Sequence, residues 1–265
     1  MGETLRELQI RVVVPVLFSE SLVEKAQHEY DHAAGPGVVM SYACLANGTR
    51  TIESEFDLAL AQPETIRECV HAEGDGCDAV VIACFGDPGA MGAKEVLSIP
   101  VVGEGEAALH LGSLLGRRLS IITVQQETVP FMVAMAERAG LGSRLASVRP
   151  VDFGVMDFNL ECIPDVVAQS AAAVTEDGAD VIVMGCTGTG VDMAAEVGRQ
   201  LAERVGSYVP VIDPVRAAVA LAELCARHGY RQSERVYPRL LIERPEYRWA
   251  ESPREAPLTL SRKET

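Results

Sequence analysis

The chain has 265 residues, of which 48% are hydrophobic and 5% aromatic, enough for a large buried core in one domain or in two small ones. Its formal net charge is −15, from 38 acidic and 23 basic residues. This charge would repel nucleic acid and anionic membranes, so we expect neither as a partner. The negative charge of the protein would also repel an anionic substrate, so such a substrate would need hydrogen-bond donors close to it in the site.

No stretch of the sequence reaches the roughly 18 apolar residues that a transmembrane helix needs. The apolar run at residues 11–16 is short, contains Pro15 and lacks a small-residue cleavage site, so it predicts a first strand rather than a signal peptide. The seven cysteines, an odd number without any CxxC spacing, argue against a disulfide framework and against a thiolate zinc site. We therefore expect reduced thiols and a cytoplasmic protein.

Short runs rich in Val and Ile alternate along the chain with alanine-rich amphipathic stretches. Apolar strands separated by helices are typical of a parallel sheet that is covered on both faces. The polar, proline-bearing tail from about residue 244 is expected to be an extended arm or disordered. We predict strands at 11–16, 78–84, 99–103, 119–124, 180–186 and 209–213, and helices at about 20–33, 63–74, 104–115, 130–139, 161–177, 191–205 and 214–228.

The sequence contains an internal repeat. Residues 76–86 read GCDAVVIACFG and residues 178–188 read GADVIVMGCTG, so that Gly, Asp, Val, Cys and Gly recur at matching positions. Further along the chain, PVVGEGEAAL at 100–109 matches PVIDPVRAAV at 210–219. The repeat indicates a duplicated α/β unit, and such halves usually pack about a pseudo-twofold axis with a cleft between them.

Each copy of the repeat has a cysteine, Cys84 or Cys186, at the carboxyl end of its predicted strand. In open α/β sheets, ligands bind outside these strand ends. A pseudo-twofold axis would bring the two thiols face to face across the cleft. Helices expected to begin at about Gly92 and Val191 offer free backbone N–H groups that would lower the thiol pKa values. We interpret the other five cysteines as small, inert core residues.

Two facing thiols suit the inversion of a carbon next to a carbonyl group. A thiolate removes the proton from one face, and the opposite thiol returns a proton to the other face. The enolate formed between these steps needs donors aimed at its oxygen. The turns Phe85-Gly86 and Thr187-Gly188 can supply backbone N–H groups, and Thr187 adds a hydroxyl.

Four segments, ACFGDPG (83–89), IPVVGEGEAA (99–108), SIITV (120–124) and GCTG (185–188), resemble the hydantoin racemase branch of the Asp/Glu/hydantoin racemase superfamily, to which allantoin racemases also belong. The resemblance covers about residues 10–230. It implies that the catalytic pair is Cys84 and Cys186. The substrate contacts that it implies are Phe85, Gly86, Thr123, Thr187 and Gly188.

The chain departs from this family's pattern at two turns. Hydantoin racemases usually carry an Asn-Pro-Asn-like turn after the first strand, where this chain has Val14-Pro15-Val16. Pro15 keeps its place among the expected substrate-binding residues, but the polar contacts beside it are missing. The turn after the second cysteine, CTGTG, differs as well. The missing polar contacts at the first turn predict a substrate whose ring or head group differs from that of a typical hydantoin racemase.

The resemblance implies an α/β fold with two similar three-layer lobes, whose parallel-sheet cores are related by a pseudo-twofold axis with the active site in the cleft. The first lobe would span 1–110 and be completed by about 214–243, the second would span 111–213, and 244–265 would form a polar arm. The implied activity is racemisation of a 5-substituted hydantoin or allantoin-like small molecule. We expect it to need no cofactor and no metal, and we expect a homo-oligomer.

Other functions remain open at this point. Amino-acid racemisation, decarboxylation of a malonate and maleate isomerisation use the same superfamily scaffold with one or both cysteines. A non-catalytic small-molecule binding protein would not need both thiols. His28-Glu29-Tyr30-Asp31-His32 matches the zinc protease motif H-E-x-x-H, which we interpret as a solvated helix face. No dinucleotide or phosphate-binding loop follows a predicted strand, and neither a Ser-His-Asp pattern nor a pyridoxal lysine is evident.

Overall fold

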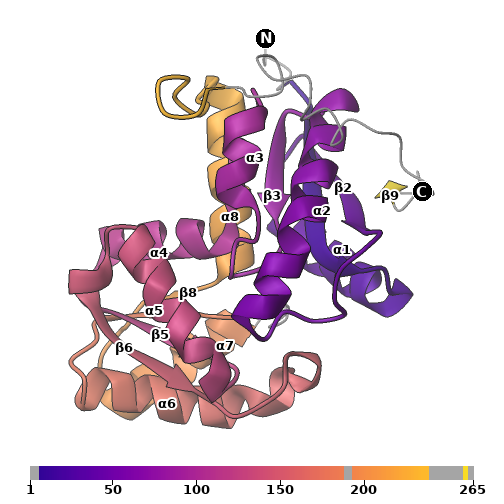
Figure 1. Ribbon diagram of the computed structural model, residues 1–265. Helices are drawn as coiled ribbons and strands as arrows, with labels where there is room; N and C mark the ends of the chain where they lie inside the picture. Colours follow the sequence, from indigo (N-terminus) through magenta and orange to yellow (C-terminus); the bar gives the residue numbers. More distant parts are fainter. Residues whose placement is uncertain (1–5, 188–192, 239–258, 262–265) are drawn as a thin grey trace.

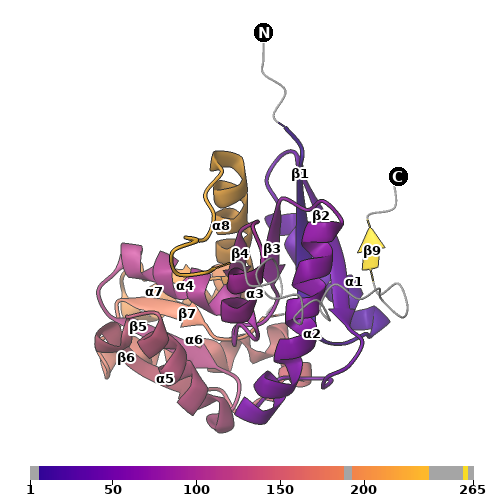
Figure 2. The ribbon, with the colours of Figure 1, turned by 45° about the horizontal axis from the view of Figure 1, so that its top comes forward.

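The computed structural model describes residues 6–187, 193–238 and 259–261, which form two sheets with helices packed around them (Figure 1, Figure 2). The first sheet has the strand order β4-β3-β1-β2-β9, and the second has the order β8-β7-β5-β6. All neighbouring strands are parallel except β9, which pairs antiparallel with β2. The strands are β1 (Leu8–Leu17), β2 (Val38–Leu45), β3 (Ala79–Ile82), β4 (Val101–Gly103), β5 (Leu119–Thr123), β6 (Leu145–Pro150), β7 (Val181–Met184), β8 (Val211–Ile212) and β9 (Thr259–Ser261).

The two sheets repeat one topology. β1 and β5 are the first strands of the two lobes. In each sheet, the second strand of the lobe lies on one side of the first strand, and the third and fourth strands lie on the other side. The sequence repeat at 76–86 and 178–188 therefore corresponds to β3 and β7, which pair with β1 and β5 respectively. The predicted α/β fold with two lobes is confirmed.

Helices connect the strands, as expected for parallel sheets. After β8, the chain returns to the first lobe with its last described helix, α8 (Figure 1). This helix packs against β1, β3 and β4. The helices are α1 (Glu20–Ala33), α2 (Glu55–Gly74), α3 (Ala90–Val96), α4 (Glu104–Leu115), α5 (Val129–Arg138), α6 (Ile163–Thr175), α7 (Met193–Val205) and α8 (Pro214–His228), with short 3-10 turns η1 (Gln126–Thr128), η2 (Gly142–Arg144), η3 (Val155–Asp157) and η4 (Leu160–Cys162).

The central strands are apolar on both faces because helices or the other lobe cover both. In β1, Ile10, Val12 and Val13 have no exposed surface, and all four residues of β3 and of β7 are equally buried. Full burial of one such side chain contributes about 1.5–3 kcal/mol. This packing fixes the strand ends, and hence the turns that follow them.

Four features differ from the sequence prediction. β2 was not predicted because Met40, Ser41 and Cys44 lack the β-branched side chains that mark a strand. The sequence does not indicate β6 because this strand is only half-buried, and it places the start of α3 at about Gly92, two residues after the observed start at Ala90. α2 begins at Glu55, where the Ser54 hydroxyl accepts a hydrogen bond from the backbone N–H of Asp57 (3.2 Å), rather than at Pro63.

Part of the C-terminal tail belongs to the first sheet. Thr259–Ser261 forms β9 at the edge of that sheet, whereas 239–258 and 262–265 lie outside the described residues. None of the described helices combines the length and hydrophobicity that a membrane span requires.

Candidate active site

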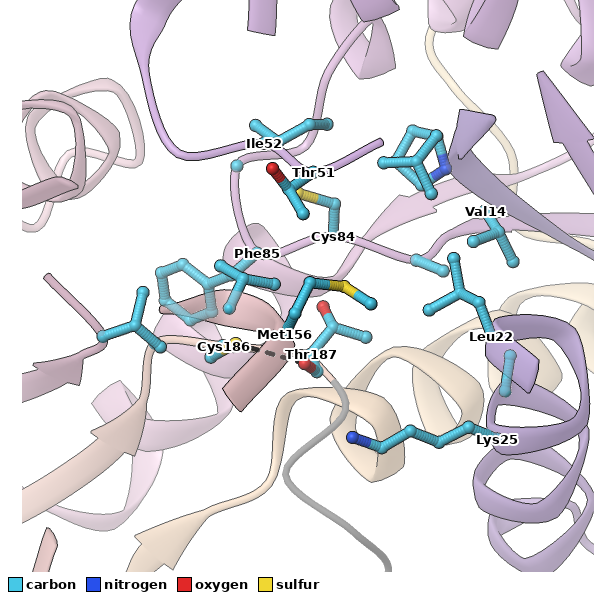
Figure 3. Close-up of a pocket in the computed structure, with 18 of the residues that line it drawn as sticks. Val14, Leu22, Lys25, Thr51, Ile52, Cys84, Phe85, Met156, Cys186 and Thr187 are labelled. Atoms are coloured by element: carbon cyan, nitrogen blue, oxygen red, sulfur yellow. Dashed lines mark hydrogen bonds between the residues drawn. The ribbon is translucent and has the colours of Figure 1, made fainter. Parts of the chain in front are cut away.

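Cys84 and Cys186 line the same pocket, which has a volume of about 260 Å³ (Figure 3). Each cysteine lies two residues beyond the end of its strand, β3 or β7. Residues from both lobes form the walls, since the pocket lies where the carboxyl ends of the two sheets meet. The Cys186 thiol donates a hydrogen bond to the backbone carbonyl of Thr187 (3.1 Å).

The turn after Cys84 is tied to the start of α4. The backbone N–H of Asp87 donates to the carbonyl of Cys84 (3.0 Å), and Asp87 takes a left-handed conformation with φ of 49°. Its carboxylate accepts hydrogen bonds from the N–H groups of Gly105 (2.9 Å) and Glu106 (2.8 Å). A Cβ atom at Gly103 would lie 2.3 Å from the Asp87 carboxyl carbon, so only glycine fits there.

Burial raises the pKa of both thiols. For Cys84 the pKa is well above its usual range; the backbone N–H of Gly86 lowers it, while the carboxylate of Glu104 raises it further. For Cys186 the pKa rises to about 12, with Lys25 lowering it and Glu104 raising it. The predicted lowering of the thiol pKa values by helix N-termini is therefore wrong for this structure, because burial and the neighbouring carboxylates outweigh such donors.

The structure gathers most of the other predicted site residues. Pro15, Phe85, Gly86 and Thr187 line the pocket together with the two cysteines. Gly188 lies outside the described residues.

Thr123 does not line the pocket. It is 1% exposed, and its hydroxyl shares a hydrogen bond of 2.6 Å with the hydroxyl of Thr128. Thr128 itself is a lining residue. Any influence of Thr123 on a substrate would therefore act through Thr128.

Sequence reasoning missed a buried carboxyl group beside the pocket. Glu104, the first residue of α4, has no exposed surface, and its two oxygens accept hydrogen bonds from the hydroxyls of Tyr30 and Thr187. Burial raises the pKa of Glu104 to about 8, although both hydroxyls lower it. The segment GEGEAA gave no signal that separates Glu104 from its neighbour Glu106, because both acids suit the first turn of a helix.

The pocket walls are mainly apolar, and cationic side chains lie among them. Lys25 of α1 enters the pocket, as Figure 3 shows, and Arg50 from the loop after β2 also lines it. These side chains can supply the local positive charge that an anionic substrate would need. The apolar lining residues include Val14, Val16, Leu22, Ile52, Phe85, Phe131, Met132 and Met156.

The H-E-x-x-H motif lies on α1. His28 and His32 are exposed, but Glu29 is buried and lines the pocket, so the prediction of a solvated helix face is wrong for Glu29. Over the part of the chain that the structure describes, no three His, Cys, Asp or Glu side chains gather as a set that could hold a metal ion.

Known proteins resemble this chain in sequence and in structure. Residues 16–222 match the profile of the Asp/Glu/hydantoin racemase family. The hydantoin racemase of Paenarthrobacter aurescens is 38% identical over 220 residues, which cover 82% of this chain and 90% of that protein. The allantoin racemase structure from Pseudomonas fluorescens superposes with a TM-score of 0.76 at 33% identity, covering 87% of this chain and 96% of the other. The one from Klebsiella pneumoniae also gives 0.76, at 31% identity, and covers 86% and 91%.

Proposed function

The chain belongs to the Asp/Glu/hydantoin racemase family and is an isomerase of the racemase type, and we propose that it racemises 5-substituted hydantoins or allantoin-like compounds with Cys84 and Cys186 as its acid and base. The observation that carries the proposal is the position of the two thiols. They occupy equivalent strand ends of a duplicated unit and line one pocket from two lobes. A two-face proton transfer requires such an arrangement.

The proposed reaction exchanges protons between the thiols and the substrate. One cysteine, as thiolate, takes the proton from C5; the C–H electron pair moves into the adjacent carbonyl and forms an enolate. The other cysteine, as thiol, gives its proton to the opposite face of C5, and the electron pair returns from the oxygen. The product is the mirror-image ring, and the thiol and thiolate have exchanged places. The next turnover can therefore run in the reverse direction without a further reagent.

The two thiolates would be stabilised by different groups. The backbone N–H of Gly86 faces the Cys84 sulfur, whereas the Lys25 ammonium acts on Cys186. Because burial opposes both charges, only a small fraction of the protein would carry a thiolate at neutral pH. Such a thiolate is correspondingly basic, which suits a weak carbon acid.

The pocket walls support a substrate with an apolar substituent at C5. Apolar side chains from both lobes dominate the lining, with Leu22 and Phe131 among them. Such walls favour an alkyl or aryl group over the polar ureido group of allantoin. The polar ring atoms would then face the turns at Phe85-Gly86 and at Thr187. The names of the similar proteins, hydantoin racemase and allantoin racemase, support both members of this substrate class.

The mechanism needs both thiols reduced, in agreement with the expected cytoplasmic location. All seven cysteines are free in the structure. The proposed reaction uses no cofactor, so dialysis against EDTA should leave its rate unchanged. A rate restored only by added zinc would instead favour a role for the H-E-x-x-H motif.

Proton NMR in D2O tests the proposal. The panel contains 5-benzylhydantoin, 5-isopropylhydantoin, allantoin, aspartate, glutamate, an arylmalonate and maleate, each with an enzyme-free control for spontaneous exchange. We expect the C5 proton signal of a hydantoin to disappear together with its optical activity. Release of carbon dioxide from the malonate would identify a decarboxylase. Binding of panel members without any turnover would identify a binding protein.

A further inference from the structure

Glu104 sits in a small buried cluster with two hydroxyl groups. Its Oε1 accepts the hydrogen bond of Tyr30 from α1, and its Oε2 accepts that of Thr187 from the turn after β7, so the cluster joins the two lobes. No ion pair among the described residues includes Glu104. Thr187 alone of the three retains partial exposure, and it lines the pocket beside Cys186.

The protonation state of Glu104 decides whether the Thr187 hydroxyl offers a hydrogen-bond donor or only acceptors to the pocket. Tyr30 has no exposed surface and its pKa lies well above the usual range, so it keeps its proton and donates it to Glu104. If Glu104 is ionised, Thr187 also donates to the carboxylate and turns only lone pairs toward the pocket. If Glu104 is protonated, it donates to the Thr187 oxygen, and the Thr187 proton becomes free to point into the pocket.

We propose that Glu104 is a positioning residue that sets the direction of the Thr187 hydroxyl, so that protonated Glu104 makes Thr187 a donor to the oxygen of the substrate enolate. The inference rests on the proposed racemisation, because only an enolate-forming reaction needs a donor at that place. Loss of the Glu104 proton would remove the donor and leave the rest of the pocket unchanged.

The surroundings of Glu104 favour its protonated form near neutrality. Asp87 and Cys84 face it from the turn after β3, Asp213 from the start of α8, Cys186 from the turn after β7, and Tyr30 from α1. Burial and the charges of Asp87 and Asp213 raise the pKa of Glu104 to about 8. The positive end of the α4 dipole would favour ionisation, but the N–H groups of Gly105 and Glu106 there already donate to Asp87. Lys25, which lines the same pocket, acts on Cys186.

The proposal predicts that the parent protein loses activity relative to Glu104→Gln as the pH rises. The thiolate fraction grows with pH in both proteins, so the measured quantity is the ratio of their kcat/KM values. As pH rises through the Glu104 pKa, the Thr187 donor disappears in the parent, and this ratio should fall roughly thirtyfold between about pH 7 and about pH 9.5. In Glu104→Gln, Tyr30 still needs an acceptor, which orients the amide oxygen toward it and the amide NH2 toward Thr187. This donor has no proton to lose, so the kcat/KM of Glu104→Gln should follow the thiolate fraction alone and rise over the whole range.

Two variants of Thr187 keep the test decisive if Glu104→Gln folds poorly. Thr187→Ser retains the hydroxyl and should keep the pH profile of the parent. Thr187→Val removes the hydroxyl, so its kcat/KM should rise roughly thirtyfold more than that of the parent between about pH 7 and about pH 9.5, whatever its absolute rate. Profiles of Glu104→Gln and Thr187→Val that run parallel to that of the parent would overturn the proposal.

A titration without substrate separates this inference from the proposed function. Carbon-13 NMR of protein labelled at the Glu carboxyl carbons should show one signal, missing in Glu104→Gln, with a midpoint near pH 8. A midpoint near the ordinary glutamate value of about 4.3 would overturn the inference. Failure of every compound in the substrate panel would overturn the racemase proposal, while this titration would still decide the protonation state of Glu104.

Discussion

Cys84 and Cys186 hold equivalent positions, each two residues beyond the strand that pairs with the opening strand of its lobe. Because the two lobes repeat one topology, the thiols reach the pocket from opposite units of the fold. The duplicated strand end thus supplies two thiols, and each thiol has different neighbouring groups. Gly86 contributes a backbone donor at one thiol and Lys25 contributes a charge at the other.

Alkylation should report the raised thiol pKa values. We expect the rate of inactivation by iodoacetamide to rise about tenfold per pH unit between about pH 7 and about pH 10, because the thiolate is the nucleophile. Substrate should protect the protein. The half-buried Cys225 would also react, so the measurement uses Cys225→Ser. A rate that levels off near neutral pH would mean that the thiol pKa values are low. Full labelling of Cys84 and Cys186 with undiminished turnover would contradict the two-thiol mechanism.

The cysteine pair could be predicted from the sequence because the two copies of the repeat align without a gap from the strand to its cysteine. The surrounding polar groups could not be predicted in this way. Glu104 and Tyr30 lie far apart in the chain, and their hydrogen bond depends on how α1 and α4 pack. The sequence does not distinguish Lys25 from other exposed helix residues, because its place at the pocket depends on how α1 packs. The thiol pKa values were mispredicted because strand-end position does not tell how deeply a side chain is buried.

Two glycine substitutions should have opposite effects on stability. In Gly105→Ala, the new Cβ would lie 2.1 Å from the backbone oxygen of Phe85, so the turn after Cys84 must move. We expect a loss of about 2–4 kcal/mol in the free energy of unfolding, together with reduced activity. Gly74, at the end of α2, has nothing within 4 Å of an added Cβ, so Gly74→Ala should be neutral or stabilise by up to about 1 kcal/mol. Urea denaturation measures both, and equal effects would contradict the close packing at Gly105.

Lys25 should affect one thiol more than the other. In a Cys84→Ala background, Cys186 is the remaining base, and the Lys25 ammonium stabilises its thiolate. Because Lys25 is exposed and screened by solvent, we expect Lys25→Met to slow deuterium exchange at neutral pH only about two- to fivefold. Lys25→Arg keeps the charge and serves as the control. In a Cys186→Ala background the same substitution should have a smaller effect. Equal slowing in both backgrounds would mean that Lys25 acts on the substrate instead.

The sharpest prediction separates the two cysteines by stereochemistry. In the proposed mechanism, each thiol serves one face of the substrate. Cys84→Ala removes the base for one enantiomer and the acid for the other. Racemisation should therefore fall by several orders of magnitude, since acid or base catalysis by a single group is commonly worth about 10²–10⁴-fold. Cys186→Ala should cause a loss of similar size.

Proton exchange should survive where inversion does not. In Cys84→Ala, Cys186 can still remove the α-proton of the enantiomer that faces it, and can return a deuteron from D2O to the same face. This variant should therefore deuterate one enantiomer without inverting it, and Cys186→Ala should deuterate the opposite one. NMR of each pure enantiomer, with chiral chromatography in parallel, distinguishes exchange from inversion. If both variants exchange the same enantiomer, or if one still racemises near the parent rate, the thiols do not serve opposite faces. A mechanism with one catalytic cysteine, as in a decarboxylase, would then describe the site better.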